Sequence, residues 1–216
     1  MKLTEAQIQE LFLFTEKKYV KYYDLQVELV DHLAMLIEEE MSINNKLSFE
    51  QALEKVYTGF GIFGFAKVVQ EKEEQFVRMG RRHMWKEFKN FFRWPEITFV
   101  ALVATIVWQL TTRINMEILF PAFFVAWVIG SFLFVFDILR NIKKQKKKLL
   151  SIQFSPAAVN GPVTLFETFY FSTIENHNAW LFCIIVTLTF LLKLATYRAY
   201  NNIFKEAVRT YPEAFA

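Results

Sequence analysis

The sequence predicts an all-α fold, in which a helical cytoplasmic domain precedes a bundle of four transmembrane helices. Two observations support this prediction. Long, nearly uncharged apolar runs lie in the second half of the 216-residue chain, whereas the first half is charged and repeats apolar residues at helical spacing. Hydrophobic residues make up 54% of the chain, including 25 phenylalanines, against roughly 45–50% in an ordinary globular domain.

Charge divides the chain at about the same place. Residues 1–80 hold 14 acidic and nine basic residues, a net charge of −5, and residues 81–216 hold eight acidic and 16 basic residues, a net charge of +8. Such an asymmetry points to a membrane or to nucleic acid. The apolar runs favour the membrane, and no helix-turn-helix or aromatic-interleaved basic motif supports nucleic-acid binding.

The single cysteine, Cys183, excludes an internal disulfide framework and a zinc site built from cysteines. Because it lies in an apolar run, we expect an inert buried thiol. The N-terminal segment 1–18 lacks the apolar core and the small-residue cleavage site of a signal peptide. We therefore expect the first half of the chain to stay on the side of the membrane where it is synthesised.

Four segments are expected to cross the membrane. Residues 96–112 and 118–138 are nearly uncharged and are joined by a short loop, which is typical of a helical hairpin. Residues 179–197 are a third strong candidate, and Lys193 lies near the end of this segment, where its ammonium can extend to the headgroups. Residues 149–171 have weaker hydropathy and are the most ambiguous of the four.

Basic residues set the expected orientation, because Lys and Arg mark the cytoplasmic side of a membrane protein. They are concentrated before the first span, in 140–148 and after the last span, whereas the loop at 113–117 holds only Arg113. Both termini are therefore expected in the cytoplasm, which requires 149–171 to span, kinked or broken at its Asn-Gly-Pro. The alternative has three spans, with 149–171 as a surface or re-entrant segment and the basic tail outside.

These expectations divide the chain into three parts. Residues 1–94 form a cytoplasmic helical module that ends in a juxtamembrane helix, residues 95–197 contain the four spans, and residues 198–216 form a cytoplasmic tail. Within the module, capping boxes at 4–7 and 48–51 indicate two helix starts. Between them, an amphipathic helix is expected over residues 22–41, and a long charged helix over residues 62–92 is expected after them.

The first third of the chain carries short motifs in a characteristic order. Glu28 and His32 lie four residues apart in an acidic helix, Ser-Phe-Glu-Gln-Ala follows at 48–52, and a Phe-Gly pair occurs at 60–61. In this order, residues 4–70 resemble the bacterial permease-prefix or HAAS-type module, a cytoplasmic helical signalling module that precedes membrane spans. The chain differs in having SINNKLS in place of the usual glycine before the third helix, and GFGIFG in place of F-G-D-P. The resemblance implies a regulatory or interaction module without catalytic residues.

One stripe of the helix over 22–41 carries four polar residues, Asp24, Glu28, Asp31 and His32. Di-iron bundles use Glu-x-x-His on paired helices, whereas here the spacing is four and no second helix offers a matching histidine. The His-Glu-x-x-His pattern of metalloproteases is absent. We expect no metal and no cofactor, and a stripe that faces solvent or caps against the next helix. Through the resemblance, these four residues become the candidates for partner binding.

Two further sets of residues have candidate roles in the membrane. Asn160 and Glu167 are polar residues within a predicted span, where an ionisable group is a functional candidate by default. The alternative for Glu167 is a place in the outer headgroup region. A basic cluster after the second span is expected to contact anionic lipid. It comprises Lys143, Lys144, Lys146, Lys147 and Lys148.

Together these features predict a non-enzymatic, multi-pass protein of the bacterial inner (plasma) membrane. We expect a signalling, regulatory or assembly role in which the helical module binds a protein partner, and the chain could also form a homo-oligomer. The alternative function is a small transporter or channel subunit with its site at the broken third span. A membrane enzyme ranks last, because only the Asp24–His32 stripe would support it.

Overall fold

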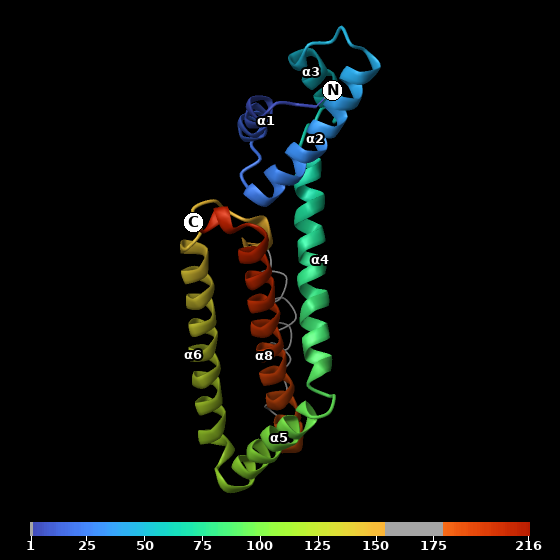
Figure 1. Cartoon of the computed structure of the whole chain (residues 1–216). Helices are drawn as coiled ribbons and strands as arrows, with labels where there is room; N and C mark the ends of the chain where they lie inside the picture. The colour runs from blue at the N-terminus through green and yellow to red at the C-terminus, as the bar shows by residue number, and fades with distance from the viewer. Residues whose placement is uncertain (1, 154–178) are drawn as a thin grey trace. The chain divides into compact units, whose positions relative to one another are not determined.

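The computed structural model describes residues 2–153 and 179–216, and within these residues all regular structure is helical (Figure 1). The all-α prediction is confirmed for this part of the chain. The chain forms two compact units. Unit 1 combines Met1–Gln75 with Gln145–Gln153 and Ala207–Ala216, and unit 2 contains Phe76–Lys144 and the described part of Phe154–Glu206.

Unit 1 is built on α1 (Glu5–Lys17), α2 (Tyr23–Ile43) and α3 (Phe49–Thr58). Both predicted capping boxes form. Thr4 and Ser48 each accept a hydrogen bond from the backbone N–H three residues later, and the glutamine there bonds back to the cap residue. Each cap contributes about 1 kcal/mol to helix stability. Gly59 ends α3, and a glycine-rich turn then leads to α4 (Ala66–Asn90).

The core of unit 1 comes from the apolar faces of its helices. Leu11 of α1 and Leu33 and Ile37 of α2 are fully buried, as is Ala52 of α3. An aromatic group adds to this core, because the Tyr57 ring meets the Phe65 ring edge-on at 5.1 Å between centroids. Burial of each large apolar side chain contributes about 1.5–3 kcal/mol. The helical periodicity read from the sequence therefore identifies the buried face correctly.

Unit 2 contains α5 (Glu96–Arg113), α6 (Met116–Lys143) and α8 (Ala179–Thr210), of which α8 ends in unit 1. By length and composition, α6 and α8 could each cross a membrane, and they are the two such helices among the described residues. They match the predicted spans over 118–138 and 179–197. The span predicted over 96–112 matches α5, which is not one of the two helices that are long and apolar enough to cross a membrane. The span predicted over 149–171 lies largely outside the described residues.

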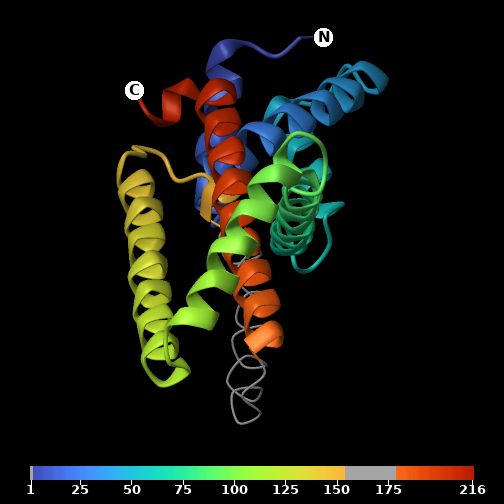
Figure 2. The same cartoon turned by 90° about the horizontal axis from the view of Figure 1, so that it is seen from below.

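Helix α5 runs antiparallel to α8 (Figure 2). Near the start of α5, Glu96 forms an ion pair with the Arg198 guanidinium at 3.1 Å. Eight residues later, the Ala104 carbonyl accepts the thiol hydrogen of Cys183 at 3.5 Å. Because the contacts move towards the start of α8 as they move along α5, the two helices run in opposite directions. The expectation of a buried Cys183 is confirmed.

Helix α6 runs parallel to α8. Phe123 meets Phe182 at 5.7 Å between ring centroids, and further along, Phe134 meets Tyr197 at 5.9 Å. Between these contacts the Lys193 ammonium donates to the Trp127 carbonyl at 2.9 Å and to the Ser131 hydroxyl. Lys193 therefore points between α6 and α8, where the Trp127 carbonyl and ring and the Ser131 hydroxyl surround its charge.

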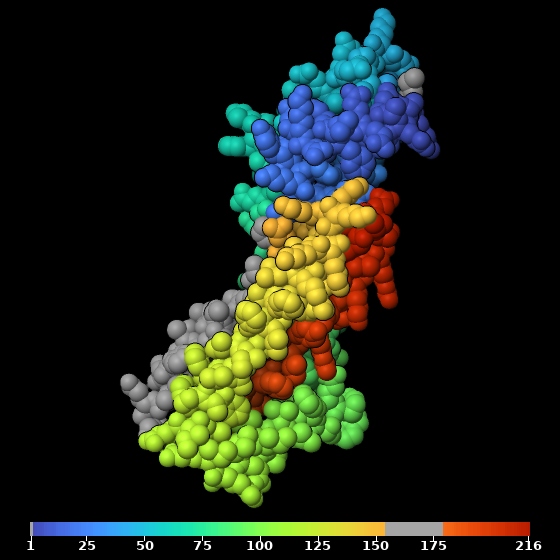
Figure 3. Space-filling model, turned by 90° about the vertical axis from the view of Figure 1, so that its left-hand side faces the viewer, coloured from blue at the N-terminus to red at the C-terminus, as the bar shows by residue number. Residues whose placement is uncertain are grey.

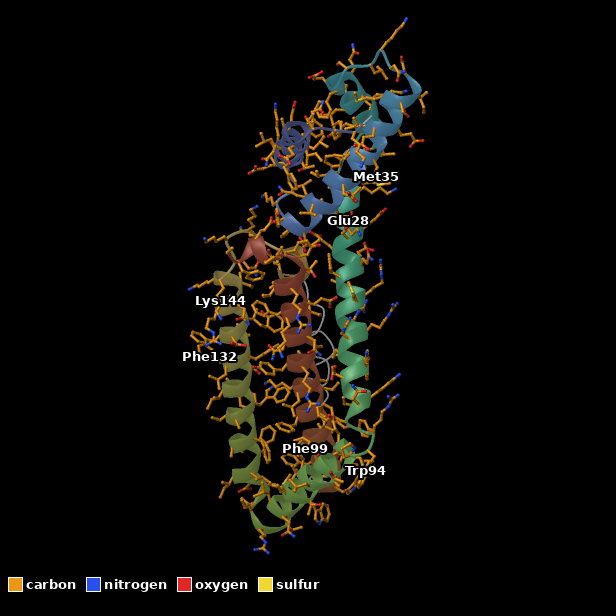
Figure 4. All side chains as sticks on the ribbon, in the orientation of Figure 1. Glu28, Met35, Trp94, Phe99, Phe132 and Lys144 are labelled. Carbon is orange, nitrogen blue, oxygen red and sulfur yellow. The ribbon has the colours of Figure 1, made fainter. Side chains whose placement is uncertain are left out.

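One side of α6 faces outward in the space-filling view (Figure 3), and the exposed side chains of this helix include many apolar ones. Only 6% of its most apolar stretch is buried, compared with 56% for α8. Phe132 is an example, on the side of α6 away from α8 (Figure 4). The apolar surface of α6 is therefore left uncovered by the rest of the described chain.

The unit 1 core gives a first prediction. Replacing fully buried Leu33 with alanine should lower the free energy of local unfolding of α1–α3 by about 2–5 kcal/mol, because it leaves a cavity. Hydrogen exchange of the full-length protein measures this change. Met35 lies on the same helix but is 62% exposed, so Met35→Ala serves as the matched control and should change stability by less than about 0.5 kcal/mol. Equal effects of the two substitutions would contradict the assigned core.

Candidate coupling site at the start of α2

The first turn of α2 holds a buried carboxylate. Asp24 is only 4% exposed, and its side chain accepts hydrogen bonds from the backbone N–H groups of Leu150 at 2.9 Å and Ser151 at 3.0 Å. Residues 150–153 are helical, so Asp24 caps the start of a helix that lies far away in the sequence. Helix N-termini carry a partial positive charge and unpaired N–H groups, and a carboxylate satisfies both.

Tyr23, the residue before Asp24, forms hydrogen bonds with two segments that are distant in the sequence. Its backbone N–H donates to the Lys148 carbonyl at 2.8 Å, and its hydroxyl donates to the Glu213 carboxylate. The Lys147 ammonium lies over the Tyr23 ring, 3.9 Å from its centroid. Tyr211 meets the same ring edge-on at 6.3 Å between centroids. One aromatic residue therefore contacts the segment that follows α6 and the segment that ends α8.

Those two segments also bond to each other. The backbone N–H groups of Lys146 and Lys147 donate to the Ala214 carbonyl at 2.8 Å and 3.3 Å, and Ala214 is fully buried. We call the assembly of Tyr23 and Asp24 with residues 145–153 and 207–216 the α2 clasp. Each of the two distant segments directly follows or completes one of the long apolar helices, α6 and α8.

The structure separates the four residues of the predicted stripe. Asp24 is buried, so the expectation that the stripe faces solvent is wrong for this residue, because a segment distant in sequence covers the first turn of α2. Glu28 forms an ion pair with Lys72 of α4 (Figure 4). Asp31 and His32 are exposed. Among the described residues, no three His, Cys, Asp or Glu side chains gather closely enough to hold a metal ion.

The predicted lysine cluster is divided between the two units. Lys143 ends α6 and Lys144 caps it, both in unit 2, whereas Lys146, Lys147 and Lys148 belong to unit 1. All five are exposed, and Lys147 also takes part in the clasp. Contact of these lysines with anionic lipid stays a prediction. The other two membrane candidates, at positions 160 and 167, lie outside the described residues.

Several members of the clasp, among them Tyr23 and Glu213, were not predicted from the sequence. Tyr23 and Glu213 carry no motif, and their partners lie at the other end of the chain. One local pattern could have indicated Tyr23: two tyrosines, Tyr22 and Tyr23, directly precede Asp24 at the start of a predicted helix. Tyrosine in such a place often uses its hydroxyl as a hydrogen-bond donor.

The tyrosines of the clasp are held in their protonated form. The hydrogen bond to Glu213, followed by burial, raises the pKa of Tyr23 to about 12. Burial, followed by the charges of Asp24 and Glu28, raises the pKa of Tyr211. The hydroxyl of Tyr23 therefore stays a donor over the whole physiological pH range.

Unit 2 contains a hollow of about 720 Å³ between α5, α6 and α8. Its lining is mostly apolar, with polar groups from Ser131, Thr189 and Lys193. Ser131 accepts a hydrogen bond from Lys193, and Thr189 donates to carbonyls of its own helix. The hollow can therefore accommodate apolar groups beside one cationic residue.

No family model, curated protein or solved structure matches the chain.

The clasp predicts a specific ionisation behaviour. Since the folded-state pKa of Tyr23 lies above the usual 10.0, its contribution to stability is complete below about pH 10 and is lost as the pH rises through about 12. At about pH 11, wild type and Tyr23→Phe should show equal tyrosinate absorbance, because Tyr23 is still protonated. Glu213→Gln should add the absorbance of one tyrosinate at that pH. A wild-type Tyr23 that ionises at its usual pKa would contradict the hydrogen bond.

Proposed function

We propose that the chain is an integral protein of the bacterial inner membrane that regulates or assembles other proteins without catalysing a reaction. In this proposal the helical module of unit 1 binds a protein partner, and the clasp transmits that event to the membrane helices. The α2 clasp is the observation that carries the proposal. It joins the module to the chain immediately after α6 and at the end of α8.

The surface of α6 supports a membrane location. Its exposed apolar side chains include Ile118, Phe132, Leu133 and Phe136. In water each such side chain forgoes about 1.5–3 kcal/mol of burial energy, whereas lipid acyl chains would cover all of them. A helix that is apolar on every side is typical of a membrane span.

Helix directions support four spans with both termini in the cytoplasm. Because the chain after α6 and the end of α8 both join unit 1, both helices would end on the side that holds the module. If α6 crosses once, the chain between residues 75 and 145 needs a second crossing, and α5 runs antiparallel to the others. Residues 153–207 also start and end at unit 1, so they must cross the membrane an even number of times. Besides α8 they need one more crossing, which we assign to residues 149–171. The basic residues assign the shared side to the cytoplasm.

The resemblance of residues 4–70 to permease-prefix or HAAS-type modules supports a signalling role. With Asp24 engaged in the clasp, we assign partner binding to the exposed part of the stripe, Asp31 and His32. Unit 1 also has exposed apolar residues, such as Met35, that suit a protein interface.

The hollow in unit 2 supports a second candidate function. A small transporter or channel subunit could use this cavity. It is lined by the two candidate membrane helices, α6 and α8, and by α5, and Lys193 is among its lining residues. A titratable residue inside a helix bundle often marks a pathway for ions or substrates. The clasp, however, has no role in such a mechanism.

Topology can be tested by cysteine accessibility in a Cys183→Ala background. With the four-span arrangement, Ala216→Cys should react with an impermeant reagent only after the cells are opened. Ile114→Cys, in the loop between α5 and α6, should react from outside intact cells. Labelling of Ala216→Cys from outside would contradict the four-span proposal.

Partner recovery separates the regulator from the transporter. After purification from native membranes in mild detergent, wild type and Glu167→Gln should recover the same protein partner. Recovery should fall by about tenfold when Asp31→Lys is combined with His32→Ala, because a loss of about 1.4 kcal/mol weakens binding by that factor. A transporter predicts the reverse pattern in a transport assay, with loss of activity in Glu167→Gln and none in the α2 variant.

A further inference from the structure

The clasp joins segments from outside α1–α3 to these helices: the Tyr23 ring stacks on Phe12 of α1 at 6.2 Å between centroids, and Leu149, Leu150 and Ile152 are fully buried. The buried apolar residues of α1–α3 pack through Leu11, Leu33 and Ala52, whereas the clasp uses the first two residues of α2 and two distant segments. Asp24 buries a charge, which disfavours folding unless hydrogen bonds compensate for it. Opening of the clasp would expose Leu149, Leu150 and Ile152, whereas α1–α3 would keep their own buried residues Leu11, Leu33 and Ala52.

Lys147 links the clasp to the basic cluster. Its ammonium lies over the Tyr23 ring, and its backbone N–H donates to Ala214 of the tail. Its neighbours Lys146 and Lys148 are exposed. The Tyr23 ring is half-buried but the Lys147 side chain is exposed, and a cation–π contact of an exposed ammonium is weak, whereas several lysines together are attracted strongly to an anionic surface. An anionic bilayer next to this segment would therefore compete with Tyr23 for Lys147.

We propose that the α2 clasp is a lipid-sensitive switch, closed by Asp24 and Tyr23 and opened when anionic lipid headgroups draw Lys147 from the Tyr23 ring. This inference rests on the proposed function, which places the basic segment at the cytoplasmic surface of the bilayer. In the closed state, residues 145–153 and the tail are bound to the module. In the open state both are released, and the module is free of the chain that follows α6 and α8.

Hydrogen exchange of the full-length protein in lipid nanodiscs tests the switch. In discs of phosphatidylcholine, residues 145–153 and 207–216 should be protected. Addition of phosphatidylglycerol to the discs should speed exchange in both segments several-fold and leave α1–α3 unchanged. Inorganic phosphate added to phosphatidylcholine discs should have no effect, and opening by phosphate alone would contradict a lipid headgroup as the ligand.

Two lysine variants form a matched pair. Lys147→Gln should remove most of the response to phosphatidylglycerol, because it removes the charge that lipid and Tyr23 share. Lys144→Gln removes a charge from the same cluster but lies in unit 2, so its response should stay close to that of wild type. Equal responses of wild type and Lys147→Gln would overturn the proposal, as would full protection of wild type in both kinds of disc.

Asp24→Asn isolates the closing contact. In phosphatidylcholine discs it should speed exchange of residues 145–153 by roughly ten- to hundredfold, because hydrogen bonds to a charged group are replaced by weaker ones. Glu28→Gln, which affects an exposed ion pair on the same helix, should leave that segment protected. Faster exchange throughout α1–α3 in Asp24→Asn would show a folding role and overturn the switch. These comparisons within one disc do not depend on the cysteine-accessibility result, so the switch and the topology fail separately.

Discussion

A buried carboxylate constrains the arrangement of unit 1. Asp24 can remain charged away from water only if donors reach it, and those donors are the backbone N–H groups of Leu150 and Ser151. The segment after α6 must therefore return to the first turn of α2. Tyr23 then binds the tail after α8 through Glu213, which brings the beginning, middle and end of the chain into one compact unit.

The directions of the apolar helices are a second feature of the fold. The two long apolar helices α6 and α8 run in the same direction, because Phe123 meets Phe182 near their starts and Phe134 meets Tyr197 further along. Helix α5 runs in the opposite direction to α8. Lys193 adds a polar contact between α6 and α8 that simple hydropathy would place at the surface.

Much of the fold could be predicted from the sequence, since it depends on near neighbours in the chain. The capping boxes at Thr4 and Ser48 and the apolar face of α2 are set by residues three or four positions apart, and the structure confirms them. The burial of Asp24 could not be predicted, because its partners lie more than 120 residues away and an acidic residue at a helix start normally faces water. Glu213 could not be predicted for the same reason, because its hydrogen bond with Tyr23 joins residues from opposite ends of the chain.

The start of α2 binds both the chain after α6 and the end of α8. Photo-crosslinking from position 23 measures this most directly, with benzoylphenylalanine in place of Tyr23 in native membranes. We expect crosslinks within one chain to peptides from residues 145–153 and 207–216. Crosslinks to neither segment, with the module otherwise folded, would contradict it.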